Sequence, residues 1–530
     1  MRMKVSDYIA RKLVETGISD VFMVTGGGAM HLDDGLGHEP GLHCIFNHHE
    51  QACAIAAECY ARIHNKIAAV CVTTGPGGTN AITGVVGGWL DSIPMLILSG
   101  QVRYDTTARS TGLGIRALGD QEFEITKAID CMTKYSEMVL DPMRIRFCLE
   151  KALYLAQVGR PGPCWLDIPL NVQGAYVEAD ELMGFDKNDY EAGGTGWSVH
   201  GSGCDGCGLC SMKTVEGQFA KIPEDEAGKG EKRELLAPSV SLDQAREILK
   251  KIREAKRPVI NAGNGIRIGK AYDVFARVVE MLGIPVVTGW NSLDCMYDSH
   301  PLYVGRAGHM GDRAGNFAVQ NCDVLLSLGS RLSIRQVGYN YPTWAREAYV
   351  IYNDIDAEEL KKPTVHVDMP VHADVKDLLE KLQMVLEVEE VEKGGGPKDP
   401  KALEQWVKRC QQWKEKYPVV QKKHYEAGKD KPANVYAAIK EISKRLEEGQ
   451  ITVVGNGSAC VVGGHAYVLK KGQRFISNSA IAAMGYDLPA AIGAWAASRK
   501  NQCYSMGSDK TGDDLILVTG DGSLQMNIQE

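Results

Sequence analysis

The sequence lacks three features, and each absence argues against a class of protein. It contains no run of about 18 uninterrupted apolar residues, which excludes a predicted transmembrane helix. It has no basic excess, because 59 Lys and Arg face 67 Asp and Glu for a net charge of -8, which argues against nucleic-acid binding. Its first 25 residues do not follow the basic and then apolar pattern of a secretory signal peptide. We therefore expect a cytoplasmic enzyme.

Glycine, in contrast, is abundant: 58 of 530 residues, about 11% against a typical ~7%. Many of these glycines follow short apolar runs, such as residues 21–24 before residues 25–28, and residues 68–72 before residues 75–80. Apolar runs of this length that end in glycines and lead into a helix are typical of buried parallel strands. The sequence therefore predicts an α/β fold.

We predict three doubly wound parallel-sheet domains, joined by two segments of different composition. The predicted divisions are residues 1–180, an insertion and linker at 185–237, a central domain at 238–385, a linker and helix at 386–432, and a third domain at 433–530. Few elements follow the last predicted strand, at residues 515–518, so we expect an incomplete third domain and a full protein that continues some tens of residues beyond Glu530.

Two helix starts carry local signals. Ser6 is a candidate cap for a first helix that Gly17 stops. Residues 241–244 form a predicted capping box for a helix whose inward face is Ala245, Ile248, Leu249 and Ile252.

Most of the 15 cysteines are expected to be reduced and many of them buried. Cys204, Cys207 and Cys210 differ, because their spacing can present three thiolates to a metal or an iron–sulfur cluster. The alternative is a flexible insertion loop with free thiols.

Glycines at strand ends allow a backbone to approach phosphate, and the following helix points its first amides at the anion. Asp521 lies between Gly520 and Gly522 after a predicted buried strand, where its carboxylate can bind Mg²⁺. The alternative is an aspartate that only caps the next helix.

Glu50 precedes a helix of small residues, 52–62. In an apolar setting its carboxyl group can share a proton near neutral pH. As a capping residue it would instead be held ionised by the helix dipole. The two interpretations predict opposite changes in its affinity for a proton.

Six segments occur in the order found in thiamine diphosphate enzymes, and the chain resembles the acetolactate synthase branch of that superfamily. They are Thr-Gly-Gly at 25–27, His-Glu-Gln at 49–51, Gly-Pro-Gly at 75–77, Asp-Ser-Ile-Pro at 91–94, Ala-Met-Gly-Tyr-Asp-Leu-Pro-Ala at 483–490 and Gly-Asp-Gly-Ser at 520–523. The resemblance covers nearly all of the chain except residues 185–237. Residues 311–320 and 329–337 further resemble the synthases of branched-chain sugars, such as CDP-4-aceto-3,6-dideoxygalactose synthase.

The resemblance implies roles for these residues. Glu50 would be the catalytic glutamate that protonates the aminopyrimidine ring of thiamine diphosphate, and Met484 would hold the cofactor bent. Asp521 would be the first Mg²⁺ ligand. The other implied cofactor contacts are Gly26, Gly27, Gly75, Asn80, Gln101, Ala482, Gly520, Gly522 and Ser523.

The resemblance also implies a reaction, in which a 2-keto acid, most simply pyruvate, loses carbon dioxide and its two-carbon unit joins a second carbonyl compound. The acceptor stays open among pyruvate, 2-ketobutyrate and a nucleotide-linked keto-sugar. The alternatives are a simple decarboxylase and a catalytically silent subunit or binding module. A homodimer or homotetramer is implied, because in this family the glutamate and the diphosphate site belong to different subunits.

The central domain of this branch often holds FAD. The implied FAD contacts are Arg160, Gly263, Gly329, Arg331, Asp354 and Asp356. The alternative is a central domain that has lost the flavin. Two departures stand against a strict match: Thr25 replaces the usual proline, and the second Mg²⁺ ligand of the family, an asparagine, would lie beyond Glu530.

Overall fold

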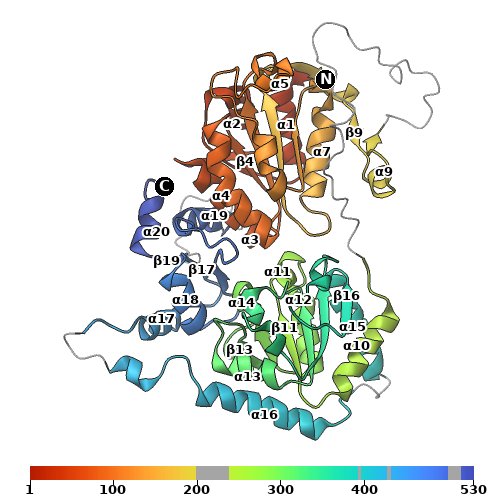
Figure 1. Ribbon diagram of the computed structural model, residues 1–530, viewed down its shortest axis with the longest axis vertical. Coiled ribbons are helices and arrows are strands. Elements are labelled where there is room, and N and C mark those ends of the chain that lie inside the picture. The colour runs from red at the N-terminus through yellow and green to blue at the C-terminus, as the bar shows by residue number, and fades with distance from the viewer. Residues whose placement is uncertain (199–237, 392–395, 427–430, 499–514) are drawn as a thin grey trace. The chain divides into compact units, whose positions relative to one another are not determined.

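Parallel β-sheets covered by helices dominate the computed structural model, which describes residues 1–198, 238–391, 396–426, 431–498 and 515–530. The predicted α/β class of parallel-sheet domains is confirmed. The chain divides into two units (Figure 1). The first unit comprises Met1–Leu236, Leu488–Ala497 and Asn527–Glu530, and the second comprises Ala237–Asp487 and Ser498–Met526.

A six-stranded parallel sheet, in the order β3-β2-β4-β5-β7-β6, forms the centre of the first unit. Every residue of β4, β5 and β7 is buried, as expected for a parallel sheet with helices on both faces. The strands are β2 (Asp20–Met23), β3 (His43–Phe46), β4 (Ala68–Val72), β5 (Met95–Gln101), β6 (Tyr135–Met138) and β7 (Pro163–Pro169). Two short antiparallel pairs accompany them: β1 (Arg2–Lys4) with β8 (Tyr176–Glu178), and β9 (Gly184–Phe185) with β10 (Trp197–Ser198).

The helices of this unit are α1 (Val5–Glu15), α2 (Met30–His38), α3 (Glu50–His64), α4 (Pro76–Asp91), α5 (Ala108–Thr111), α6 (Ile125–Ile129), α7 (Ile145–Leu155), α8 (Leu170–Gln173), α9 (Lys187–Glu191) and most of α19 (Asp487–Ser498). Among them, α2, α3, α4, α6, α7 and α8 contact the strands of the sheet. Helix α19 packs closely on α3, because a Cβ atom on Gly493 would lie 2.0 Å from the carbonyl oxygen of Ala56. Only glycine permits this approach.

The prediction that Ser6 caps the first helix is wrong. Helix α1 begins at Val5, its N-cap is Lys4 without a side-chain hydrogen bond, and Ser6 is buried inside the helix. The first helical amide, that of Val5, donates to the carbonyl oxygen of Ala175 at 2.9 Å. The pairing of β1 with β8 therefore supplies the acceptor that a capping side chain would otherwise provide.

The second unit contains a six-stranded parallel sheet in the order β13-β12-β11-β14-β15-β16. Its strands are β11 (Pro258–Ala262), β12 (Val286–Thr288), β13 (Tyr303–Arg306), β14 (Val324–Leu328), β15 (Tyr349–Asp354) and β16 (Met369–His372). Its helices are α10 (Leu242–Glu254), α11 (Gly265–Ile268), α12 (Tyr272–Leu282), α13 (Arg313–Asn321), α14 (Ile334–Val337) and α15 (Val375–Val391). The cap predicted for α10 is confirmed, since the Ser241 side chain accepts from the amide of Gln244 at 3.1 Å. The buried face of α10 is the predicted one.

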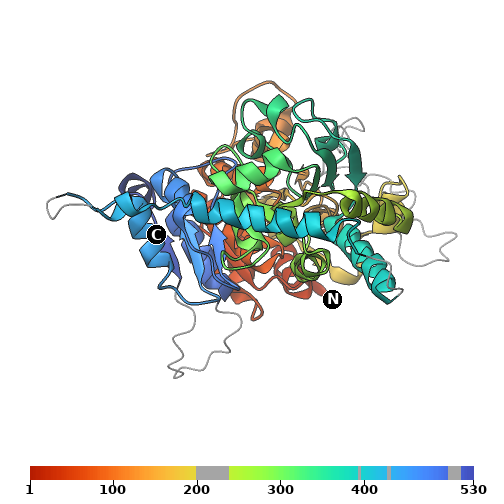
Figure 2. The ribbon, with the colours of Figure 1, turned by 90° about the horizontal axis from the view of Figure 1, so that it is seen from below.

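A smaller parallel sheet of the same unit has the order β18-β17-β19. Its strands are β17 (Ile451–Val454), β18 (Arg474–Ile476) and β19 (Ile516–Val518), and its helices are α17 (Val435–Ser443), α18 (Ser458–Ala466) and α20 (Asp521–Met526). The long helix α16 (Pro400–Lys416), seen lengthwise in Figure 2, packs on α13. Within the described residues, no helix is long and apolar enough to cross a membrane.

A buried ion cluster joins the two sheets of the second unit. Asp294, after β12, accepts from the side chain of Arg474 on β18 at 2.6 Å and from the amide of Phe475 at 3.3 Å. Burial opposes ionisation of Asp294, but Arg474 and Arg267 outweigh it and hold the pKa of this carboxyl below its usual value.

Candidate functional site

Glu50 is the first residue of α3 and is half-buried. Its Oε2 atom accepts from the side-chain amide of Asn80 on α4 at 3.0 Å, so the structure brings together two residues that the sequence implicated separately. The side-chain cap of α3 is made by His49, whose Nδ1 accepts from the amide of Gln51 at 3.1 Å. The Glu50 carboxylate is therefore not the side-chain cap of α3 and is oriented by Asn80.

The glycine turns near this helix are tightly packed. A Cβ on Gly26 would lie 2.5 Å from the Cβ of Thr73, and a Cβ on Gly75, whose φ is +61°, would lie 2.4 Å from the carbonyl oxygen of Gln121. Both positions therefore require glycine for the local fold. A Cβ on Gly27 would meet nothing within 4 Å, so its backbone is open to a ligand.

Asp33 is a residue beside these turns that the sequence did not indicate. Its Oδ2 atom accepts from the amide of Gly26 at 3.1 Å, and its buried Oδ1 atom has no hydrogen-bond partner within the described residues. Burial raises the pKa of this carboxyl group to about 6. The turn at Gly26 thus presents an unsatisfied polar atom.

Gln101 ends β5 and is buried, and its side-chain amide makes four hydrogen bonds with neighbouring residues. Its Nε2 atom donates to the carbonyl oxygen of Phe123 at 2.9 Å and to Asp167 at 3.0 Å. Its Oε1 atom accepts from the Thr74 hydroxyl at 2.7 Å and from the amide of Val102 at 3.0 Å. These four contacts fix Gln101 at the carboxyl end of its strand.

Asp167 lies in the middle of β7 and is fully buried. It accepts from the Ser99 hydroxyl at 2.6 Å in addition to Gln101. Burial raises the pKa of its carboxyl group to about 7, against the lowering effect of the two hydrogen bonds. An acidic residue in an otherwise apolar buried strand was the signal available in the sequence.

The glycine-rich loop after β19 is fixed to the turn that precedes α19. The Ser523 hydroxyl donates to Asp487 Oδ1 at 3.0 Å and accepts from the amide of Gly485 at 2.8 Å. The hydroxyl of Thr519 also donates to Asp487. Asp487 was within a recognised motif, but its role as the link between the two loops was not predicted.

Met484 and Ala482 shape the same turn. Ala482 has a φ of +57°, and the Met484 side chain is 48% exposed although it is large and apolar. A Cβ on Gly522 would lie 3.4 Å from Met484 Cε, so Met484 lies over the glycine loop. The side-chain amide of Asn456, just after β17, donates to the carbonyl oxygen of Ala483. The loops after all three strands thus meet at one edge of the sheet, where ligands of open α/β sheets bind.

The loop fits a diphosphate and a magnesium ion in its chemistry. A Cβ on Gly520 would meet nothing within 4 Å, and Asp521 is exposed, with a carboxylate that makes no hydrogen bond or ion pair with any described residue. Among the described residues, no three His, Cys, Asp or Glu side chains are grouped as metal ligands. A hard cation at Asp521 would therefore complete its shell with other oxygens, such as those of phosphate.

Five of the six residues implicated in flavin binding lie together at the carboxyl edge of the larger sheet of the second unit. The sixth, Arg160, does not. Gly263 and Gly329 follow the neighbouring strands β11 and β14, and a Cβ on Gly263 would lie 2.2 Å from the Gly329 carbonyl oxygen. Asp354 ends the next strand, and its carboxylate accepts from the amide of Asp356 at 3.0 Å. Arg331, with a φ of 42°, lies in the loop after Gly329.

Arg160 belongs to the first unit. Its Nε atom donates to the Ser92 hydroxyl at 2.8 Å, and its carbonyl oxygen accepts from Lys134 at 2.8 Å. The cysteine cluster predicted at Cys204, Cys207 and Cys210 lies outside the described residues.

Three family models match the chain. The thiamine pyrophosphate enzyme N-terminal TPP binding domain matches residues 3–123, the thiamine pyrophosphate enzyme central domain matches residues 245–382, and the thiamine pyrophosphate enzyme C-terminal TPP binding domain matches residues 455–530. Together these segments span more than half of the chain and contain both glycine-rich sites and the larger sheet of the second unit.

Several curated proteins are similar to the chain over nearly its whole length. The acetolactate synthase large subunit of Lactococcus lactis is 29% identical over 528 residues, 99% of this chain and 77% of the relative. The acetolactate synthase isozyme 3 large subunit of Escherichia coli is 29% identical over 526 residues, 99% of this chain and 79% of the relative. The chloroplastic acetolactate synthase 1 of Zea mays is 28% identical over 537 residues, 99% of this chain and 70% of the relative.

Proposed function

The chain belongs to the thiamine pyrophosphate-dependent enzymes, and we propose that it decarboxylates a 2-keto acid, most simply pyruvate, and joins the two-carbon unit to a carbonyl acceptor. The similarity to acetolactate synthase large subunits supports this activity. The main structural support for this activity is the position of Glu50 at the start of α3. Its carboxylate accepts a hydrogen bond from Asn80 and is not the side-chain cap of the helix.

Bound thiamine diphosphate supplies an electron sink for the loss of carbon dioxide. Glu50 would hold a proton at its carboxyl group for the nitrogen of the cofactor's pyrimidine ring, and Asn80 would keep that carboxyl group oriented. The open backbone at Gly27 and the unsatisfied Asp33 oxygen support a ligand at the neighbouring turn. Gln101 would act by keeping the end of β5 fixed rather than by offering a free side chain.

In the second unit, Asp521 would bind Mg²⁺, while Gly520, Gly522 and Ser523 would hold the diphosphate. The half-exposed Met484 would offer an apolar surface to the cofactor, and the backbone of Ala482 would hold its pyrimidine ring. The proposal includes a homodimer or homotetramer, as the family resemblance implies, because in that family the glutamate and the diphosphate site belong to different subunits.

We also propose that the larger sheet of the second unit binds FAD. Gly263, Gly329, Arg331, Asp354 and Asp356 cluster beyond three neighbouring strands, which is where open parallel sheets bind dinucleotides. Arg160 would contribute from the first unit. Purified protein should then carry the visible absorbance of a flavin, and a colourless protein that takes up no added FAD would contradict this part of the proposal.

Incubation of the protein with pyruvate, thiamine diphosphate and Mg²⁺ tests the proposed activity. We expect consumption of pyruvate with formation of acetolactate. Acetaldehyde as the main product would indicate a simple decarboxylase instead of a carboligase. Unchanged pyruvate in the presence of bound cofactor would indicate a catalytically silent subunit.

Identification of the acceptor substrate requires a second set of reactions. Residues 311–320 and 329–337 resemble synthases of branched-chain sugars, so a nucleotide-linked keto-sugar should be offered beside pyruvate and 2-ketobutyrate. The acceptor that is consumed with the highest kcat/KM identifies the subtype.

A further inference from the structure

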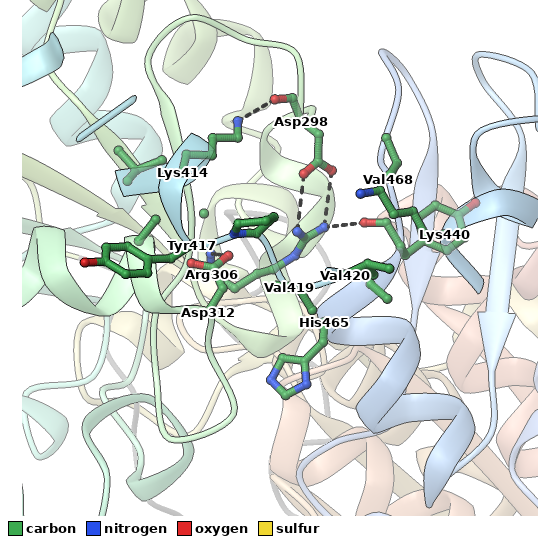
Figure 3. Close-up of a pocket in the computed structure, with 16 residues that line it drawn as sticks. Asp298, Arg306, Asp312, Lys414, Tyr417, Val419, Val420, Lys440, His465 and Val468 are labelled. Atoms are coloured by element: carbon green, nitrogen blue, oxygen red, sulfur yellow. Dashed lines mark hydrogen bonds and ion pairs between the residues drawn. The ribbon is translucent and has the colours of Figure 1, made fainter. Parts of the chain in front are cut away.

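A cavity of about 210 Å³ lies inside the second unit, and none of the residues proposed above to hold a cofactor lines it. It is bounded by the end of β13, the start of α13, the end of α16 with the segment that follows it, and residues of α17 and α18 (Figure 3). Its volume is below the ~300–1,000 Å³ of pockets for drug-sized ligands, so it suits a molecule of a few carbon atoms.

Arg306 is the most buried cation of this cavity, with 6% of its surface exposed. Its two terminal nitrogens donate to Asp298 at 3.3 and 3.2 Å, and one of them also donates to the carbonyl oxygen of Tyr467 at 2.7 Å. Figure 3 shows the guanidinium and the Asp298 carboxylate facing each other. The remaining donor, Nε, is buried and has no hydrogen-bond partner within the described residues.

The two acidic residues of the cavity are already satisfied by the protein. Asp298 accepts from the amide of Leu469 at 2.7 Å in addition to Arg306. Asp312 accepts from the amides of Arg306 and Gly315, at 2.9 and 2.7 Å. These carboxylates therefore do not leave an unmet demand for a cation.

Two basic residues of the cavity, Lys414 and Lys440, make no ion pair with a carboxylate of the described residues, whereas Arg306 is paired with Asp298. Lys414 donates to two carbonyl oxygens, those of Asp298 and Tyr303, at 2.6 and 3.0 Å, and burial lowers its pKa. The side-chain ammonium of Lys440, which also lines the cavity, makes no hydrogen bond or ion pair with any described residue, and burial together with Lys444 lowers its pKa. For both ammonium groups the loss of water outweighs the attraction of nearby carboxylates, among them Asp298.

Much of the remaining wall is apolar, while His465 and the rings of Tyr417 and Tyr467 also line it. The aliphatic side chains are those of Val304, Ala314, Val419, Val420, Ala466 and Val468. A bare inorganic anion would satisfy the cations but would leave this apolar surface in contact with water. A neutral apolar molecule would fill the space and leave Arg306 Nε unsatisfied, which is costly for a buried donor. A small carboxylic acid with an apolar body meets both requirements.

We propose that this cavity is a binding site for a short-chain monocarboxylate, with its carboxylate held by Lys440 beside the Arg306 guanidinium and its apolar body against the valines. The site is separate from the residues that the proposed reaction uses, so it would hold an effector rather than the reacting substrate.

Isobutyrate is a suitable probe, because it has no keto group and cannot be decarboxylated. We expect isothermal titration calorimetry of the purified protein to detect isobutyrate binding with a dissociation constant that does not change when thiamine diphosphate is added or when Glu50 is replaced by Gln. Isobutyramide, its uncharged counterpart, should bind at least tenfold more weakly.

Three variants localise the binding. Lys440→Met should weaken isobutyrate binding at least tenfold, and Val419→Phe, which places a larger side chain in the cavity wall, should remove it. Lys471→Met changes an exposed lysine of the same unit and should leave binding unchanged. Each variant is checked for unchanged circular dichroism.

Four results would overturn the proposal: no isobutyrate binding, equal binding of isobutyramide, tighter binding of inorganic phosphate, or undiminished binding by both Lys440→Met and Val419→Phe. A catalytically silent protein that still binds isobutyrate would contradict only the proposed reaction, so the two proposals can fail independently.

Discussion

Asp487 accepts a hydrogen bond from the Ser523 hydroxyl at 3.0 Å, which joins the turn before α19 to the glycine-rich loop after β19. The same carboxylate lies so close to Gly455 that a Cβ there would be 2.4 Å from Asp487 Oδ2. One side chain thus fixes three segments at the edge of the small parallel sheet, which is the proposed diphosphate and Mg²⁺ site.

Asp487→Asn should therefore weaken thiamine diphosphate binding, because an amide replaces one of two acceptor oxygens with a donor. We expect the KM for thiamine diphosphate to rise about tenfold, the effect of losing roughly 1.4 kcal/mol of binding free energy, with a smaller change in kcat at saturating cofactor. Glu448→Gln, an exposed change of charge in the same unit, is the matched control. An unchanged KM in Asp487→Asn would remove the linking role from this residue.

Arg62 forms a buried ion network with Glu58 and Asp91. Its Nε donates to Glu58 at 2.7 Å and its Nη2 donates to Asp91 at 2.5 Å, so the network joins α3 to α4. Arg62→Met would leave two buried carboxylates without their cation, and we expect a loss of about 3–5 kcal/mol in the free energy of unfolding. Urea titration measures the loss, and the exposed Arg11→Met should change it by less than about 0.5 kcal/mol. Equal stability of the two variants would contradict the role of the network.

Asp167 should make the first unit less stable as pH rises. Because burial raises the pKa of its folded-state carboxyl from the ordinary 3.8 to about 7, the folded protein keeps a proton that the unfolded chain releases between these two values. Stability then falls as pH rises through this window, by at most about 4 kcal/mol at 1.36 kcal/mol per pKa unit.

Asp167→Asn removes this titration. The difference in unfolding free energy between wild type and variant should favour wild type more at about pH 5 than at about pH 8. Urea titrations at the two pH values measure it. An equal difference in unfolding free energy at the two pH values would mean that Asp167 does not change its protonation on folding.

Periodicity and caps were enough to predict the elements whose signals are local. Ser241 caps α10 and its four inward residues are buried as expected, because both features depend on neighbours in the sequence. Ser6 was misread, because the acceptor for the first amide of α1 comes from Ala175, far away in the chain. Strand-end glycines likewise indicated the parallel sheets but not their order, which depends on pairing between distant strands.

The sequence motifs predicted the residues of the candidate site, but they did not predict the hydrogen bonds that hold these residues in place. Glu50 and Asn80 were both named, but nothing in their spacing states that they touch. Asp33, Asp167 and Asp487 were missed, because their importance lies in burial and in hydrogen-bond partners that only the folded chain brings near them. The cavity around Arg306 is assembled from residues between 298 and 468 that are far apart in the sequence, and it has no sequence signature.

The most direct test of the central claim is the comparison of cofactor binding and turnover in Glu50→Gln. Glutamine keeps the size of the side chain and can still contact Asn80, but it cannot hold the proton that the reaction requires. We expect thiamine diphosphate to bind Glu50→Gln with nearly wild-type affinity while pyruvate turnover falls about 10²–10⁴-fold, and the exposed control Glu181→Gln to retain full activity. Wild-type turnover by Glu50→Gln with bound cofactor would contradict the account.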